Sequence, residues 1–385
     1  MLMVAVRPSG PDRGFAPPDG RRDVEMGSGS VAFKAIPRPL APRRSSRPLA
    51  PPGAIAYGPP MKLVPTAANP IPDGAIVSRV VARDGAPLRV ARWPARTERP
   101  RGTVAIFQGR AEFVEKWFET IEDLLGMGFC VVAFDWRGQG GSERTLADPR
   151  KGHVGRFGLY ARDVEAIAAQ VLARDCPRPH AVLAHSMGAA IALDLARRGR
   201  LPAERLIALA PMLGIVRVTH PRLAYAATTL AWLAGFGGSY VPGGGETSQT
   251  TKPFAGNPLT SDRLRYARNA DAAAALGDGA IGDPTIGWAR GAFALMRRLA
   301  EPRAALEIRI PTLVIAAGAD RVVSTPAAER FAARLKTGNA LVVPGARHEL
   351  IAEVDAIREP VMAAIEAFLP QPAQASTEAP APARS

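Results

Sequence analysis

The sequence predicts an α/β fold in which helices cover both faces of a mostly parallel sheet. Three observations support this prediction. Short apolar runs typical of buried strands recur along the chain, stretches with apolar residues at helical spacing lie between them, and one strand leads directly into a helix through Ala184-His185-Ser186-Met187-Gly188. Strands that alternate with helices form parallel sheets with both faces covered.

The pattern begins with two strands. Ile76–Ala82 and Leu88–Trp93 flank Asp84-Gly85, a dipeptide typical of hairpin turns. Thr103–Phe107 is short and apolar, as expected for a buried strand. The spacing of apolar residues then predicts helix Glu115–Met127, strand Phe129–Phe134 and helix Phe157–Ala173.

The alternation continues to the end of the pattern. A strand over 181–185 leads into the helix that follows Ser186, and further strands are expected at Leu206–Ala210, Thr312–Ala316 and Leu341–Val343. Pro360 is expected to open a final helix to Phe368, because proline is tolerated at a first helical position.

One segment interrupts this alternation. Residues 211–300 contain apolar helical stretches around 223–233 and 285–299, with glycine-rich and proline-containing turns between them. They predict a helical cap insertion after a strand, in a position to cover a site at the sheet edge.

Composition separates both ends of the chain from the core. Residues 1–60 hold 12 of the 37 prolines and predict a disordered extension, which makes Met61 an alternative start of translation. Residues 371–385 predict a disordered tail. The expected α/β core comes in two parts, 61–210 and 301–370.

The net charge of +14 raises the question of a nucleic-acid partner. Residues 1–60 contribute 9 Lys and Arg against 4 Asp and Glu, and the remaining excess is scattered without a long basic block. Because no recognition motif accompanies the charge, the sequence does not favour nucleic-acid binding. A surface for anionic lipid head groups is compatible with it.

Other features bear on location and cofactors. Cys130 and Cys176 lack metal-type spacing, which favours a reducing, cytoplasmic compartment. Apolar Met1–Val6 ends too soon for a signal peptide, and the apolar part of 223–245 is too short to cross about 30 Å of hydrocarbon. The histidines are dispersed, and no cofactor or metal is expected. The glycine-rich stretch Asp135–Ser142 lacks the features of a phosphate loop and predicts a structural turn near the site.

Ser186 is the candidate nucleophile. A serine at a sharp turn from strand to helix has a strained backbone and requires small residues two positions before and after it. Gly188 meets this requirement, and Ala184 stands where the common motif has glycine.

The oxyanion hole is expected to consist of two backbone amides. One belongs to Met187, the residue after the nucleophile. The other belongs to Arg110, in the loop after the strand Thr103–Phe107, where Gly109 allows close approach.

A serine hydroxyl needs a base, and the base needs a carboxylate that fixes its tautomer. At a turn of this kind the chain order is serine, acid, histidine. His348 follows the last strand and Asp320 follows Thr312–Ala316, so these are the candidates. The alternatives are His220, which no strand precedes, and Asp283, which lies before the strand in a helix-capping context.

With these residues in place, the chain resembles α/β-hydrolases of the monoacylglycerol lipase and bacterial lysophospholipase group. The resemblance covers about residues 70–370 and rests on Gln108–Phe113, Asp135–Gly140, His185–Gly188, Asn257–Thr260, Pro284–Trp288, Gly318–Asp320 and Gly345–Glu349. It implies the α/β-hydrolase fold, with the family's nucleophile on Ser186, its acid on Asp320 and its base on His348. Many relatives have His-Gly where this chain has Gln108-Gly109, which leaves the head-group preference open.

The expected activity is hydrolysis of carboxylic esters of single-chain acyl lipids, either lysophospholipid or monoacylglycerol, through an acyl-enzyme. Gly109, Glu112 and Trp288 are expected to contact the substrate. The apolar cap is expected to house the acyl chain and to touch the inner membrane surface transiently. The alternatives are a small-ester esterase or iminopeptidase on the same fold, and a catalytically idle protein that binds at the membrane surface. The oligomeric state stays open.

Overall fold

An eight-stranded sheet forms the centre of the computed structural model, which describes residues 61–371. The predicted extension at 1–60, and the predicted tail beyond residue 371, lie outside the described residues. The strand order is β1-β2-β4-β3-β5-β6-β7-β8. β1 and β2 pair antiparallel, as do β2 and β4, and every other neighbouring pair is parallel. The predicted mostly parallel sheet is therefore confirmed.

The strands keep close to their predicted positions. They are β1 (Ile76–Val81), β2 (Pro87–Trp93), β3 (Thr103–Phe107), β4 (Cys130–Phe134), β5 (His180–His185), β6 (Arg205–Leu209), β7 (Thr312–Ala317) and β8 (Gly338–Val343). Every residue of β3, β4, β5 and β7 is buried, because layers on both faces cover the middle of the sheet. The outermost strands are more open: β1 exposes four of its six residues and β8 three of six.

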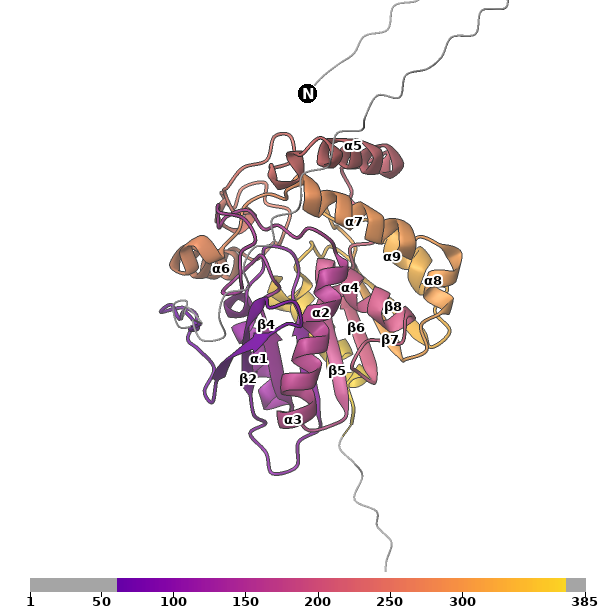
Figure 1. Cartoon of the computed structure of the whole chain (residues 1–385). Coiled ribbons are helices and arrows are strands. Elements are labelled where there is room, and N and C mark those ends of the chain that lie inside the picture. The colour runs from indigo at the N-terminus through magenta and orange to yellow at the C-terminus, as the bar shows by residue number, and fades with distance from the viewer. Residues whose placement is uncertain (1–60, 372–385) are drawn as a thin grey trace, which may run out of the picture. The chain divides into compact units, whose positions relative to one another are not determined.

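Helices cover the two faces of the sheet, and further helices lie above one end of it (Figure 1). They are α1 (Phe118–Gly126), α2 (Gly158–Ile167), α3 (Ala173–Asp175), α4 (Ser186–Arg197), α5 (Pro221–Leu233), α6 (Arg263–Leu276), α7 (Ile286–Leu299), α8 (Pro302–Leu306), α9 (Thr325–Ala332) and α10 (Asp355–Phe368). Arg358 of α10 binds Asp123 of α1, so these two helices share one face of the sheet. α2 and α4 pack together on the other face.

α10 corrects one prediction. The helix begins at Asp355, so Pro360 lies inside it and does not open it. An internal proline costs about 3 kcal/mol. Val361 and Ile365 are fully buried beside it, and each such side chain contributes about 1.5–3 kcal/mol. Packing against the core therefore outweighs the broken helical hydrogen bond.

Helices α5, α6, α7 and α8 lie in the chain between β6 and β7. α5 and α7 coincide with the helical stretches expected around 223–233 and 285–299. α7 packs on α4, and α5 packs on α7 as the outermost helix above one end of the sheet (Figure 1). The boundaries predicted for the cap and for the two parts of the core stay predictions. From residue 61 to residue 371, no helix has both the length and the apolar character needed to cross a membrane.

Candidate active site

The turn between β5 and α4 holds Ser186 in a strained backbone conformation, with a φ of +49°. α4 begins very close to the end of β3. A Cβ atom on Gly188 would lie 2.2 Å from the carbonyl oxygen of Phe107 and 2.4 Å from that of Gln108, so this position requires glycine. Ala184 is fully buried, and the core accommodates the methyl group that replaces the usual glycine.

The structure brings the three candidate side chains of the sequence analysis together. His348 Nε2 lies 3.0 Å from Ser186 Oγ, and His348 Nδ1 lies 2.8 Å from Asp320 Oδ2. Because Asp320 accepts at Nδ1, the neutral imidazole carries its proton there and leaves Nε2 free to accept the serine proton. The arrangement can therefore activate the Ser186 hydroxyl as a nucleophile.

Asp320 stays ionised at this position. Its Oδ1 accepts hydrogen bonds from the amides of Val322 at 2.7 Å and Val323 at 2.9 Å. Burial alone would raise the pKa of Asp320, but the hydrogen bond and charge of His348 and these two amides hold it below its usual value. The carboxylate is thus fixed in place and ready to stabilise an imidazolium.

Among the residues that the structure describes, the Arg110 amide is free in the loop after β3. The Gly109 amide donates to Glu112 Oε2 at 2.6 Å, and the Ala111 amide donates to Gln139 Oε1 at 3.3 Å. The Arg110 amide between them has no acceptor among residues 61–371, and neither has the Met187 amide in the first turn of α4. Two free amides at facing ends of β3 and α4 are the donors that an oxyanion hole needs.

The glycine-rich segment after β4 forms a structural turn that supports this loop. Gln139 Nε2 donates to the carbonyl oxygens of Gly109 and Glu112, both at 2.9 Å. Asp135 accepts from the amides of Val114 at 3.0 Å and Gly141 at 2.7 Å. These bonds fix the backbone on both sides of Arg110.

Glu112 and His185 form a buried pair that the sequence analysis did not identify. His185 Nδ1 lies 2.6 Å from Glu112 Oε1, and His185 Nε2 lies 3.0 Å from the carbonyl oxygen of His348. The pair therefore connects the oxyanion loop, the serine turn and the histidine loop. Apart from its place beside Ser186, His185 had no distinguishing signal in the sequence, because its partners are far away along the chain.

This pair is charged. Burial alone would lower the pKa of His185, but the charge of Glu112 raises it above its ordinary value. Burial alone would raise the pKa of Glu112, but His185 and Lys116 lower it to about 2. Both ring nitrogens of His185 face acceptors, which agrees with a doubly protonated imidazolium.

The other predicted residues lie around this centre. Both carboxylate oxygens of Glu112 already bind protein groups. Gly109 packs closely on His185, since a Cβ atom on it would lie 3.0 Å from His185 Nδ1. The substrate contacts expected of Glu112 and Gly109 stay predictions. Trp288 is buried at the start of α7. The alternatives lie elsewhere: His220 is exposed before α5, and Asp283 accepts from the Gly245 amide at 3.1 Å.

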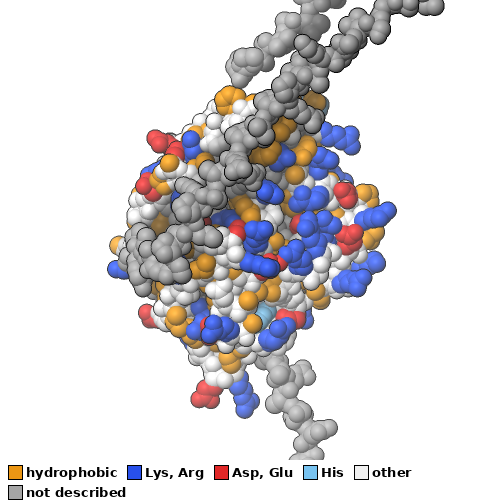
Figure 2. Space-filling view, viewed as in Figure 1, with side chains coloured by type: hydrophobic (Ala, Val, Ile, Leu, Met, Phe, Trp, Pro, Cys, Tyr) orange, Lys and Arg blue, Asp and Glu red, His pale blue; other side chains and the backbone are white. Residues whose placement is uncertain are grey.

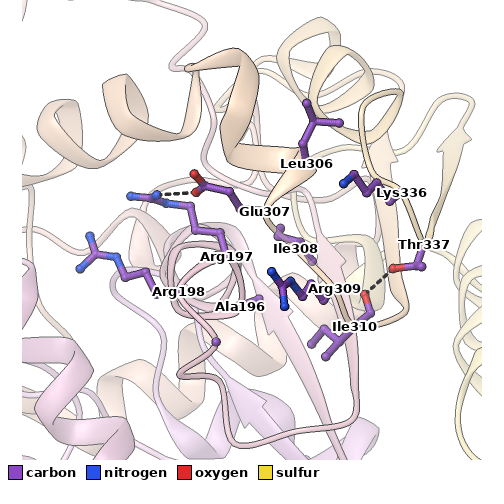
Figure 3. A pocket seen from close by; sticks show the side chains of 11 residues that line it. Ala196, Arg197, Arg198, Leu306, Glu307, Ile308, Arg309, Ile310, Lys336 and Thr337 are labelled. Carbon is purple, nitrogen blue, oxygen red and sulfur yellow. Dashed lines mark hydrogen bonds and ion pairs between the residues drawn. The ribbon is translucent and has the colours of Figure 1, made fainter.

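One cavity of about 630 Å³ lies at the other edge of the sheet (Figure 3). Its lining includes Arg197 and Arg198 at the end of α4, Ile310 before β7, and Lys336 and Thr337 before β8. These positions are at the amino ends of the strands, whereas Ser186 follows the carboxyl end of β5. This basic cavity is separate from the site around Ser186.

The chain is similar to known proteins. A family model described as "Serine aminopeptidase, S33" matches residues 98–355. Lysophospholipase L2 of Escherichia coli (strain K12) is 35% identical over 296 residues, which cover 74% of this chain and 84% of that protein.

Two solved structures share the fold. A carboxyl esterase from Bacillus coagulans has a TM-score of 0.63 at 20% identity, with 77% of this chain and 98% of that chain covered. A soluble variant of monoglyceride lipase from Saccharomyces cerevisiae has a TM-score of 0.60 at 18% identity, with 77% and 95% covered. The fold of this chain is the α/β-hydrolase fold.

Replacing Asp320 by asparagine tests its role as the acid. We expect kcat for ester hydrolysis to fall about 10⁴-fold, as it does for the same change in a serine protease triad, because His348 loses the partner that fixes its tautomer. Asp283→Asn, which changes the alternative acid, is expected to lose less than about tenfold in the same assay. A loss below tenfold for Asp320→Asn would assign the acid role to another residue.

Replacing Glu112 by glutamine tests the buried pair. At neutral pH we expect the free energy of unfolding to fall by about 3–5 kcal/mol, because His185 stays buried without a counter-charge. The pKa of Glu112 is about 2 in the folded chain against an ordinary value of 4.5. The stability that its charge contributes is therefore present above pH 4.5 and is lost as the pH falls towards 2.

Denaturant unfolding of the wild type and the variant at pH 6 and pH 3 measures this difference. The difference in the free energy of unfolding between the wild type and the variant should be smaller at pH 3 than at pH 6. An equal difference at both pH values would contradict the charged pair. Glu122→Gln is the control, because its pair with Arg96 is exposed and is expected to change stability by less than about 1 kcal/mol.

Proposed function

The chain belongs to the α/β-hydrolase family whose model matches residues 98–355. On that premise we propose that it hydrolyses carboxylic esters of single-chain acyl lipids, either lysophospholipids or monoacylglycerols, through an acyl-enzyme on Ser186. The observation that carries the proposal is the hydrogen-bonded series from Asp320 through His348 to Ser186 Oγ. The names of the relatives support the substrate class, since one is a lysophospholipase and another is a monoglyceride lipase.

The first half-reaction forms the acyl-enzyme. Ser186 Oγ attacks the ester carbonyl carbon while His348 Nε2 takes the hydroxyl proton, and the carbonyl electrons move to the oxygen. The amides of Arg110 and Met187 stabilise that oxyanion. When the tetrahedral intermediate collapses, the bond to the alcohol oxygen breaks and His348 gives its proton to the leaving alcohol.

The second half-reaction releases the fatty acid. Water enters where the alcohol was, and His348 Nε2 takes one of its protons as the oxygen attacks the acyl carbon. Collapse of the second intermediate breaks the bond to Ser186 Oγ, which regains a proton from His348. Asp320 stabilises the imidazolium in both halves.

α5 supports contact with a lipid surface. Leu223, Leu230 and Leu233 are 67%, 68% and 68% exposed, and their spacing places them along one face of the helix. Phe236 beyond the helix is 58% exposed. Figure 2 shows hydrophobic side chains along the upper edge of the molecule, where Figure 1 places α5. An apolar face of this kind is typical of helices that lie in a membrane interface. The cytoplasmic location expected from the sequence stays a prediction.

Acyl-chain dependence tests the proposed substrate class. We expect kcat/KM to rise as the acyl chain lengthens past about eight carbons, because each buried methylene contributes about 0.8 kcal/mol. Ser186→Ala should abolish turnover, and activity within tenfold of the wild type would remove Ser186 as the nucleophile. A kcat/KM that stays flat or falls with acyl-chain length would favour a small-ester esterase. Cleavage of peptides with an N-terminal proline would favour an iminopeptidase. Binding to vesicles without any turnover would favour an idle binding protein.

Replacing both Leu230 and Leu233 by glutamate tests the membrane contact. We expect at least about a tenfold weaker association with phosphatidylcholine–phosphatidylglycerol vesicles in a sedimentation assay, because two apolar side chains no longer insert. Leu306→Glu on α8 is the control and should bind as the wild type does. An unchanged Tm shows that the variant is folded, and unchanged vesicle binding would contradict a role for α5.

A further inference from the structure

Arg110 carries a positive charge next to the reacting centre without a carboxylate to balance it. Its Nη2 donates to the carbonyl oxygen of Gly282 at 2.7 Å, and its guanidinium carbon lies 5.1 Å from the ring centre of Trp288. Its Nε is buried and has no hydrogen-bond partner in the described part of the chain. Within that part, no carboxylate forms an ion pair with it.

Arg110 is half-buried, and the arginines that are fully buried among residues 61–371 are all paired with carboxylates. Arg89 binds the carboxylates of Glu115 at 2.7 Å and Asp135 at 2.6 Å, and Arg137 binds two further carboxylates. Near Arg110, the carboxylate of Asp283 already accepts from the Gly245 amide. Burial lowers the pKa of Arg110 to about 10, and the charges around it do not offset this effect. The side chain remains a cation at neutral pH and, although half-buried, has no carboxylate partner among the described residues.

Two neighbouring polar groups share this lack of partners. Trp288 Nε1 and the Tyr240 hydroxyl are both buried and make no well-formed hydrogen bond in the described residues, although the Tyr160 hydroxyl lies next to the indole N–H. Tyr240 pairs through its backbone with Thr285, the residue that caps α7 just before Trp288. The Nζ atom of Lys151 lies 5.3 Å from the Tyr240 ring centre. Lys151 also pairs with Asp148 at 3.8 Å, so the positive charge that lacks a carboxylate partner in this cluster is that of Arg110, and a group that completes the cluster must supply acceptor oxygens and negative charge.

The place of Arg110 in the site fixes which part of a substrate meets this cluster. Its own amide is one of the two free donors that the proposed function assigns to the ester oxygen. With the ester bound in that way, the guanidinium would lie at most one arginine side-chain length from the ester carbonyl. In a lysophospholipid, the glycerol places the phosphodiester at a comparable distance from that carbonyl, whereas a monoacylglycerol has a hydroxyl there.

We infer that Arg110, with the indole N–H of Trp288, binds the phosphodiester of a lysophospholipid and makes this substrate preferred over a neutral monoacylglycerol. The inference rests on the proposed function and specifies its head group. A guanidinium suits this task because its parallel N–H groups match two phosphate oxygens. The phosphodiester supplies the missing counter-charge when the substrate binds, so the cost of the unpaired cation is removed in the complex.

Paired substrates test the preference. Lysophosphatidylcholine and monoacylglycerol with the same acyl chain are presented in neutral detergent micelles, and the ratio of their kcat/KM values is measured. In Arg110→Met the ratio should fall about ten- to hundredfold towards monoacylglycerol, the size expected for a lost charge-assisted hydrogen bond. The ratio for Arg110→Lys should lie between those of the wild type and Arg110→Met. The ratio for Trp288→Phe should shift in the same direction as for Arg110→Met, but by less.

Arg309→Met is the matched control. Arg309 lies on the far, amino edge of the sheet, and removing its charge should leave the ratio unchanged. Equal losses on both substrates in Arg110→Met would mean that the side chain only supports the oxyanion loop, and an unchanged ratio would mean that it does not touch the head group. Either result overturns the inference.

Inhibition separates the failure of this inference from the failure of the proposed function. Dodecylphosphocholine has the phosphodiester but no carboxylic ester, so it cannot be hydrolysed at Ser186. It is tested as an inhibitor of p-nitrophenyl butyrate hydrolysis. Its Ki should rise at least about tenfold in Arg110→Met, while the Ki of the neutral dodecyl maltoside should not. Inhibition by inorganic phosphate at the same low concentration would indicate a general phosphate site and overturn the assignment to a lipid head group. If neither lipid is hydrolysed but these Ki values differ as expected, the proposed function fails and the anion subsite stands.

Discussion

The site depends on the close contact between the first turn of α4 and the end of β3. Gly188 allows α4 to begin against the carbonyl oxygens of Phe107 and Gln108, and this contact holds Ser186 at a φ of +49°. Met187 is fully buried, and the Met212 amide binds the Ser186 carbonyl oxygen at 3.0 Å, so the surrounding core maintains the strain. The same contact brings the serine hydroxyl and the two free amides to one place.

Buried ion pairs then fix the loops that complete the site. Glu112 and His185 connect the oxyanion loop to the carbonyl group of His348, and Arg89 with Asp135 holds the turn after β4. Such pairs add little net stability, because removing two charges from water offsets most of their attraction. Their directed hydrogen bonds do fix geometry, and here they fix the backbone on both sides of Arg110. Arg110 differs from these buried charges, since it is half-buried and its anion is expected to arrive with the substrate.

Much of the fold could be predicted from local sequence patterns. β3, β4 and β5 are continuous apolar runs, and the serine turn has a short-range signature, so their positions followed from a few residues each. α6 was not predicted, because alanines cover much of its buried face and leave only a weak apolar stripe. α9 was not predicted because its 8 residues are fewer than the window over which a helical period is recognised. The start of α10 was wrong, because burial of Val361 overrode the usual effect of Pro360. The His185–Glu112 pair joins residues 73 positions apart, and no local pattern encodes such a contact.

The central claim is that His348 makes the hydroxyl of Ser186 reactive at the carboxyl edge of the sheet. The most direct measurement is the rate of covalent labelling by a fluorophosphonate, with the modified residue identified by mass spectrometry of the digested protein. The account predicts a single label on Ser186 and a rate at least about 10³-fold lower in His348→Gln. A label on another residue, or an equal rate in the variant, would contradict it.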